Sequence, residues 1–321
     1  MANISANTPK PLKAFLHSFS QVVLVENVIS GILIVAAIFI FSWEVSNWNI
    51  GLAAVVAAIV GNITAKVLGH DEGAICSGLF GFNPVLVGIG AATFFTGIDV
   101  YIIAVLGSIL VIPLITVINK ICSRFGLPGL TMPFIAMTWF FILISFQTGL
   151  LTAVGREGTL VEVGAVSGAV VLNVNEVIWI DALTKGIGEI YLLDSVVASL
   201  VILVAFAIDR WHLAIKIAGA IVVSLIMGLI FDVDMWTLNM GLYTYNAILV
   251  LMGMETFSKN KDEGSFCRSN RYWLLVLLGL VFVCLVDYAM PTILMPMALP
   301  TLTFSFVLVT WGLLYFEQQL V

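Results

Sequence analysis

Polar and aromatic residues recur at matching places in the two halves of this 321-residue sequence. The matched pairs are Thr131 with Thr303, Asn83 with Asn246, Phe82 with Tyr245, and Gln21 with Glu189. Hydroxyl and amide oxygens accept hydrogen bonds from N–H donors, and aromatic rings present flat apolar faces. An ion would lose its hydration among such groups with no compensating charge. The pairs therefore indicate a path for a small, flat, neutral solute that is rich in N–H donors.

Each of these residues also has an interpretation that involves no solute. The two threonines could bond only to carbonyls of their own helices, as threonine in membrane helices does. The two rings could be ordinary packing, and the two asparagines could bond to backbone ends. Glu189 could lie in a solvated outer loop.

The elements that position these residues must be membrane helices. Residues of the set AVILMFWYC make up 61% of the chain, 10% of the residues are charged, and the mean hydropathy is +1.13. Soluble domains are about 25% charged. The net charge of −6 excludes nucleic-acid binding, which needs a basic surface. Four cysteines and three histidines show no ligand spacing, so we expect neither a metal nor a cofactor.

Ten apolar segments are candidate membrane spans, since a crossing helix needs about 20 apolar residues. Several of them are shorter than a full crossing. They are Val22–Trp43, Ile50–Leu68, Gly78–Phe95, Val100–Ile121, Met132–Phe146, Ser195–Ile208, Leu213–Ile230, Gly241–Thr256, Trp273–Asp287 and Thr303–Phe316.

Basic residues indicate the orientation of these spans. With ten spans and both termini in the cytoplasm, 11 of the 13 lysines and arginines fall on the inner side, and only Arg156 and Lys185 fall outside. Cytoplasmic loops of membrane proteins are enriched in basic residues. We therefore predict a multi-pass protein of the cytoplasmic (inner) membrane, surrounded by lipid, with both termini inside.

The halves also share sequence beyond single residues. LPGLTMPFIAMTW at 127–139 and LPTLTFSFVLVTW at 299–311 agree at seven of 13 positions. GLFGFNPVLVGIG at 78–90 matches GLYTYNAILVLMG at 241–253, and a weaker match begins at His17 and Lys185. The offsets of 172, 163 and 168 follow the same order along both halves. These matches predict an internal repeat.

Five spans per repeat is an odd number, so the second repeat must enter the membrane upside down, with the path between the halves. Proline disfavours helix at the preceding residue. We therefore expect short, half-spanning or re-entrant helices that begin near Thr131 and Thr303, with their N-termini meeting near the centre of a pore. The fold class expected is an all-α integral membrane protein with two inverted five-helix repeats.

The spans divide the chain into five segments. Residues 1–20 are expected to be a cytoplasmic N-terminal segment, residues 21–146 the first repeat, and residues 147–184 a mostly external linker. Residues 185–316 form the inverted second repeat, and residues 317–321 a C-terminal tail.

The LPGLTMPF sequence at 127–134 resembles the LPxxTxPF signature of the urea transporters, and GLFGFN at 78–83 is similar to another stretch of that family. The resemblance runs from about Gln21 to Trp311. It implies ten spans in two inverted halves, a homotrimer with one pore in each subunit, and passive, channel-like facilitated diffusion of urea. It also implies a transporter and not an enzyme.

The resemblance also assigns residues to the path. Thr131 and Thr303 would flank the constriction, Glu189 would line the outer site, and Gln21 the inner one. Hydrophobic slots would be formed by Phe82 and Leu86 in one half and by Tyr245 and Leu249 in the other. Two departures bear on the choice between urea and a related small amide. Ser305 stands where the signature has proline, and Tyr245 stands in a slot usually walled by phenylalanine.

Other function classes remain to be compared with this one. The runner-up is an ion-coupled secondary transporter of a small amide or another neutral solute, with Asp194, Asp287, Glu255 or Glu189 titrating. A membrane enzyme is disfavoured because the sequence holds no H-E-x-x-H, no G-x-S-x-G and no cluster of Cys, His and Asp. A purely structural protein would gain nothing from polar residues repeated at midplane depth.

Overall fold

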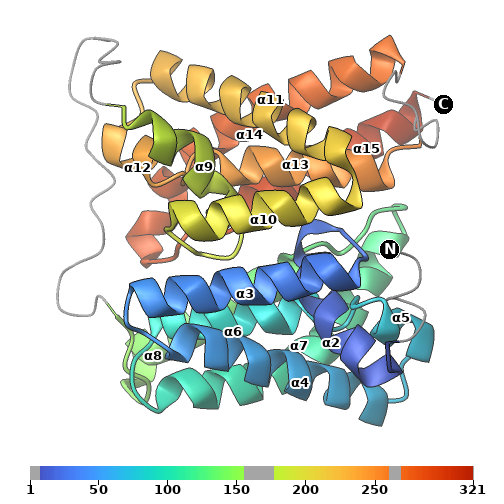
Figure 1. The fold of residues 1–321 in the computed structure, drawn as a ribbon, viewed down its shortest axis with the longest axis vertical. Helices are drawn as coiled ribbons and strands as arrows, with labels where there is room; N and C mark the ends of the chain where they lie inside the picture. Colours follow the sequence, from blue (N-terminus) through green and yellow to red (C-terminus); the bar gives the residue numbers. More distant parts are fainter. Residues whose placement is uncertain (1–7, 155–176, 260–268, 321) are drawn as a thin grey trace.

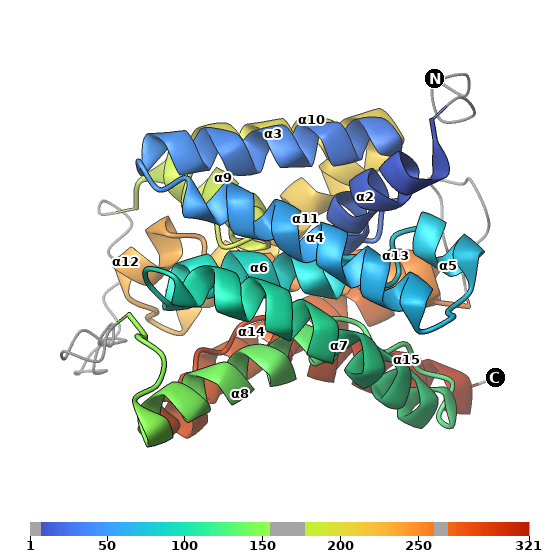
Figure 2. The same cartoon turned by 90° about the horizontal axis from the view of Figure 1, so that it is seen from below.

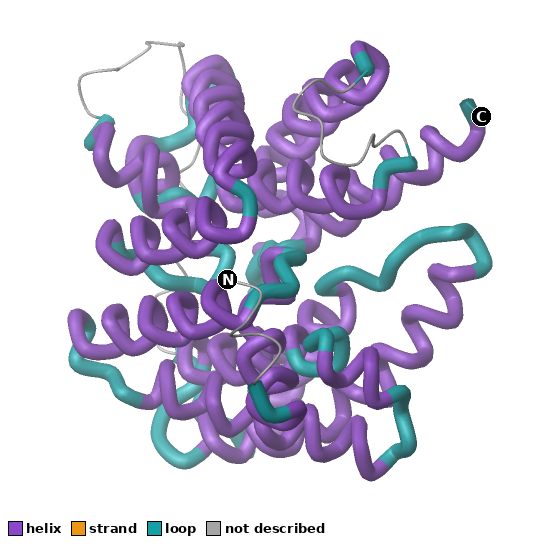
Figure 3. The backbone as a smooth tube through the Cα atoms, turned by 45° about the vertical axis from the view of Figure 1, so that its right-hand side comes forward, coloured by secondary structure: helices purple, strands orange, loops and turns teal. Residues whose placement is uncertain are grey.

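The computed structural model describes residues 8–154, 177–259 and 269–320. Within these ranges the chain consists of helices joined by short loops and contains no strand, apart from an isolated bridge between Phe95 and Ala153 (Figure 3). The apolar stretch Val163–Ile180 of the expected linker lies mostly outside the described residues.

Residues 8–154 contain seven α-helices and one short 3-10 helix. They are α2 (Lys10–Ser20), η1 (Gln21–Val23), α3 (Val28–Glu44), α4 (Asn49–Val67), α5 (Glu72–Cys76), α6 (Phe82–Phe94), α7 (Asp99–Ser123) and α8 (Met132–Thr148).

The α-helices in the described part of the second half repeat this order. The helices there are α9 (Trp179–Glu189), α10 (Val196–Asp209), α11 (Trp211–Ile230), α12 (Met235–Asn239), α13 (Tyr245–Phe257), α14 (Asn270–Leu294), η3 (Met295–Met297) and α15 (Phe304–Gln319). The 3-10 helix η3 follows α14 instead of the first helix of its half.

The residues that cap the N-termini of the helices recur at the same offsets as the sequence matches. Asn27 caps α3 and Ser195, 168 residues later, caps α10. Asp71 caps α5 and Asp234, 163 residues later, caps α12. In each case a side-chain oxygen accepts a bond from a backbone N–H of the first turn, which would otherwise be unpaired.

Left-handed backbone also recurs between the halves. Leu24 has φ 56° and Leu192 has φ 57°, while Leu130 has φ 51° and Leu302 has φ 49°. Leucine rarely adopts this conformation. Leu130 and Leu302 each directly precede one of the paired threonines, so the chain makes the same sharp turn before α8 and before α15.

Buried positions follow the same spacing. All nine buried residues of α7 recur 172 residues later as the nine buried residues of α14. The eleven buried residues of α6, at positions 82–92, recur 163 residues later in α13, at positions 245–255. The two halves therefore bury corresponding helix faces.

Helices α2–α8 and helices α9–α15 form two stacked groups (Figure 1). The view in Figure 2 shows α3 beside α10 along one edge of the molecule, and these two helices contact each other. Ser30 of α3 donates a hydrogen bond of 2.8 Å to the carbonyl of Ala205 in α10. On the opposite side α8 contacts α15. A further link joins the groups where the Tyr191 hydroxyl, just after α9, donates a 2.7 Å hydrogen bond to the carbonyl of Phe19 in α2.

Helix lengths confirm a multi-pass membrane protein. Among the described residues, four helices are long and apolar enough to cross a bilayer: α4, α7, α11 and α14 (extended by η3). The α2–η1 segment and α3 together form a fifth, bent by 76°. The remaining five predicted spans correspond to α6, α8, α10, α13 and α15, which have 13 to 17 residues.

Several expected segment and span boundaries do not coincide with the ends of helices. Residues 10–20 of the expected cytoplasmic segment form α2, whose last turn is buried. The predicted span Val22–Trp43 is interrupted, since the chain is not helical between Leu24 and Asn27. The boundary at residue 184 falls inside α9, and the expected tail at 317–321 begins inside α15, where Glu317 is buried.

Candidate functional site

The paired threonines lie at the starts of two short helices and touch each other. Thr131 immediately precedes α8, and Thr303 immediately precedes α15. Their hydroxyl oxygens are 2.7 Å apart, within hydrogen-bonding distance, and both residues are buried. The expectation that the two N-termini meet is therefore confirmed. Each hydroxyl bonds to the other half of the chain, not only within its own helix.

The turns that precede these helices are completed across the two halves. The indole N–H of Trp139 in α8 donates a 2.8 Å hydrogen bond to the carbonyl of Pro300, before α15. The indole N–H of Trp311 in α15 donates a 2.7 Å hydrogen bond to the carbonyl of Pro128, before α8. Irregular backbone inside a membrane needs such partners. The reciprocal bonds fix the two threonines against each other.

Asn83 bonds to backbone, as its structural interpretation predicts, whereas Asn246 bonds both to backbone and to the side chain of Asp287. Asn83 donates to the carbonyl of Leu130 over 3.3 Å and accepts from the N–H of Phe134 over 3.0 Å. Asn246 donates to the carbonyl of Leu302 over 3.3 Å. These amides serve carbonyl and N–H groups that the chain breaks before α8 and α15 leave outside the helices.

The ring pair begins helices α6 and α13. Phe82 and Tyr245 are the first residues of these helices and are 9% and 7% exposed. Leu86 and Leu249, one turn later on the same face, are 1% exposed. The Tyr245 hydroxyl donates a hydrogen bond of 2.5 Å to the carbonyl of Leu302.

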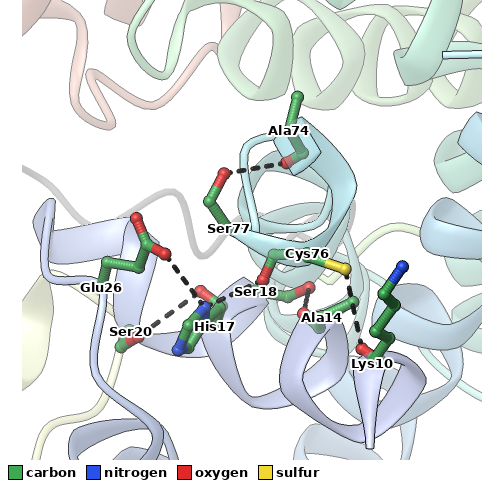
Figure 4. A network of polar contacts seen from close by, with 9 residues as sticks. All are labelled: Lys10, Ala14, His17, Ser18, Ser20, Glu26, Ala74, Cys76 and Ser77. Carbon is green, nitrogen blue, oxygen red and sulfur yellow. Dashed lines mark hydrogen bonds and ion pairs between the residues drawn. The ribbon is translucent and has the colours of Figure 1, made fainter. Parts of the chain in front are cut away.

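Gln21 follows directly after α2, a helix that carries a network of polar contacts (Figure 4). His17, one turn before Gln21, bonds through Nδ1 to the carbonyl of Cys76 over 2.9 Å, and the same nitrogen lies 3.8 Å from the Glu26 carboxylate. Ser18 donates to the carbonyl of Ala14. Gln21 itself is 8% exposed. Its segment, η1, packs against α6, so Gln21 stands near the helix that begins with Phe82.

Glu189 occupies the matching place in the second half. It is the last residue of α9 and is 7% exposed, which excludes the solvated-loop interpretation. Lys185, one turn before it, forms ion pairs of 2.9 Å with Asp181 and 2.8 Å with Asp194. Helix α9 packs against α13, so Glu189 stands near the helix that begins with Tyr245.

All eight predicted site residues are thus buried in the interior, and the structure brings Thr131 and Thr303 into direct contact. A cavity of about 290 Å³ lies elsewhere, behind the turn before α8, and includes none of the eight. It is lined by Ser123, Gly126, Leu127, Pro128, Phe257, Lys259, Leu314, Glu317 and Gln318. Sequence reasoning assigned no role to Trp139, Trp311, Leu130 or Leu302, although the tryptophans and leucines were among the matched positions.

Comparison with known proteins decides the family. The sequence model described as "Urea transporter" matches residues 12–318, nearly the whole chain. The chain belongs to the urea transporter family. This is a family of transport proteins and not of enzymes, in agreement with the multi-pass helical fold.

Individual members of the family match part of the chain. Urea transporter 1 of Rattus norvegicus is 37% identical over 123 residues, urea transporter 1 of Mus musculus 36%, and urea transporter 1 of Ovis aries 34%. The match covers 37% of this chain and 31% of each relative. The matched segment thus spans less than one third of the length of these curated relatives.

Proposed function

We propose that this member of the urea transporter family conducts urea passively through a pore that passes beside the Thr131–Thr303 pair. The observation that carries the proposal is their 2.7 Å contact at the meeting point of two short helices. A hydroxyl that donates to its partner keeps lone pairs that can accept from a solute N–H. Urea carries four N–H donors and no charge, so these acceptors can replace water that it loses.

The proposed path continues from this pair toward both membrane faces. Phe82 with Leu86, and Tyr245 with Leu249, would form flat apolar slots, while Gln21 and Glu189 would offer oxygens at the inner and outer ends. The packing of η1 on α6 and of α9 on α13 supports this order. The two halves would be inverted repeats of five spans each, which the recurrent caps, left-handed leucines and buried positions support.

The proposal includes the setting of the protein. The chain would lie in the cytoplasmic membrane with both termini inside, as its basic residues indicate, and would assemble as a homotrimer with a pore in each subunit, as the family resemblance implies. The solute would be urea or a closely related small amide.

The ion-coupled alternative receives less support from the geometry. Of its four candidate acids, Asp194 pairs with Lys185 and Glu255 pairs with Lys216 over 2.7 Å. The Glu255–Lys216 pair is buried, and a carboxylate that neutralises a lysine within such a pair is costly to protonate or to move. The side chain of Asp194 is 37% exposed and is already paired with Lys185. Dependence of uptake on a proton or sodium gradient would favour this alternative and refute the passive channel.

Stopped-flow urea flux in proteoliposomes tests the proposal. Wild-type flux should be indifferent to pH gradient and voltage and should saturate only at high urea concentration. Substituting both Thr131→Val and Thr303→Val keeps the shape of the side chains and removes both acceptors. Flux should fall at least about tenfold, since each lost hydrogen bond to a desolvated donor costs about 1–3 kcal/mol.

Thr93→Val is the matched control. Its hydroxyl bonds to the carbonyl of Ile89 in its own helix over 3.0 Å, so the same substitution there should leave flux unchanged. Unchanged flux in the double variant, with the protein folded, would remove the threonines from the proposed path.

A further inference from the structure

The surroundings of the turn before α15 differ chemically from those of the corresponding turn before α8. Where α6 begins with Phe82 and Asn83, α13 begins with Tyr245 and Asn246. At the offset of 172 that relates α7 to α14 and α8 to α15, Ile115 corresponds to Asp287 and Pro133 to Ser305. The second half therefore has a phenol, a carboxyl and a hydroxyl where the first half has apolar groups.

These polar groups are close to one another and buried. Asn246 donates through Nδ2 to a carboxyl oxygen of Asp287 over 2.8 Å, and the same nitrogen lies 3.3 Å from the carbonyl of Leu302. Asp287 is 9% exposed, and Asn246 and Ser305 are fully buried. Within the described part of the chain no cation pairs with Asp287. A buried carboxyl of this kind is costly and indicates a specific use.

The carboxyl changes what the asparagine does. In the first half Asn83 uses its amide oxygen to accept from the backbone N–H of Phe134. In the second half the amide oxygen of Asn246 has no hydrogen-bond partner. Asn246 is thus turned toward Asp287 instead of closing the start of the following helix.

The carbonyls of the two left-handed leucines are also unequal, because Tyr245 supplies a hydroxyl donor that Phe82 lacks. Leu130 accepts one side-chain hydrogen bond, from Asn83. Leu302 accepts two, from Asn246 and from the Tyr245 hydroxyl. A carbonyl oxygen has two lone pairs, so Leu302 is saturated. Beside Leu302 the acceptor that remains for a passing solute is the phenolic oxygen of Tyr245.

We infer that the Tyr245 hydroxyl sets the substrate preference of this half of the path, and that Asp287 is a positioning residue that acts on it through Asn246 and Leu302. The inference rests on the proposed function. The hydroxyl favours a solute with a free N–H and narrows the slot by one oxygen atom. It discriminates against N-alkylated ureas, which carry one donor fewer and more bulk.

Proteoliposome flux of urea and of N-methylurea, measured in parallel, tests the inference through their ratio. Tyr245→Phe should lower the urea to N-methylurea ratio about fivefold, which is the effect of one neutral hydrogen bond. Tyr243→Phe is the matched control, because Tyr243 is also buried and its hydroxyl donates to the carbonyl of Cys284 over 2.7 Å. Loss of this hydroxyl, which lies outside the proposed path, should leave the ratio unchanged.

Variants of Asp287 test the positioning role. Asp287→Asn keeps an acceptor oxygen for Asn246 and should retain the wild-type ratio. Asp287→Ile introduces the residue that the first half has at the corresponding position 115. It should lower the urea to N-methylurea ratio in the wild-type background and should not lower it further in the Tyr245→Phe background. If Asp287→Ile does not fold, Asn246→Ala makes the same comparison.

The outcomes separate this inference from the proposed function. Wild-type protein without urea flux would overturn both. Wild-type urea flux with an unchanged ratio in Tyr245→Phe would overturn the role of the hydroxyl alone. Equal effects of Asp287→Ile with and without the Tyr245 hydroxyl would show that Asp287 does not act through Tyr245.

Discussion

Substitution of Glu255 should destabilise the protein more than removal of the whole ion pair to which it belongs. Glu255 accepts from Lys216 over 2.7 Å and from the Tyr272 hydroxyl over 2.5 Å, and the two charged side chains are 1% and 3% exposed. The Lys216 ammonium also lies 5.2 Å from the centre of the Trp273 ring.

The magnitude follows from this burial. Glu255→Gln leaves the Lys216 ammonium without a charged partner in a nearly dry interior, a change that costs about 3–5 kcal/mol. The double variant Lys216→Met and Glu255→Gln removes both charges and should be close to neutral. The first half shows that this position needs no charge, because Ala53 and Ala92 occupy the corresponding buried positions 163 residues earlier.

Thermal unfolding in detergent, followed by the loss of the folded species on size exclusion, measures the difference. Glu255→Gln should lower Tm by roughly 6 °C or more, and the double variant should recover most of that loss. Glu72→Gln is the control, since the Lys10–Glu72 pair is 71% and 66% exposed, and Tm should not change. A double variant less stable than Glu255→Gln would refute the reasoning.

Two further predictions concern the turns. Trp139→Phe should lower stability by about 1 kcal/mol, because the partly buried hydrogen bond to the carbonyl of Pro300 is lost; an unchanged Tm would contradict this. Gly241→Ala should prevent accumulation of folded protein, since a Cβ there would lie 2.2 Å from a neighbouring backbone nitrogen at φ +75°. Gly69 has the same φ, but a Cβ added there would have no atom within 4 Å. Comparing the expression of Gly241→Ala with that of Gly69→Ala therefore separates the effect of steric collision from that of backbone strain.

The sequence predicts most of the helices because membrane spans are recognised by composition alone. The expected Met132–Phe146 is observed as Met132–Thr148, and Leu213–Ile230 as Trp211–Ile230. Helix α2 is missed because Lys10–Ser20 carries lysines and serines and is buried only by tertiary packing. The break after η1 is missed because the apolar run continues through it unchanged.

The same contrast holds for the candidate site. The meeting of Thr131 and Thr303 is expected from the repeated LP turns together with the predicted five spans in each repeat. The contact between Asn246 and Asp287 joins residues 41 positions apart on two helices, and only the packing of α13 against α14 reveals it. The sequence shows Asp287 as an acid near a helix end, without its partner.

The exchange of indole bonds between the halves constrains the order in which the protein can mature. During synthesis the carbonyl of Pro128 lacks its indole donor until Trp311 has left the ribosome. Helix α8 therefore reaches its final environment only when almost the entire polypeptide has been made. The first half cannot complete the turn before α8 in advance, and a chain that stops before residue 311 lacks the donor to the carbonyl of Pro128.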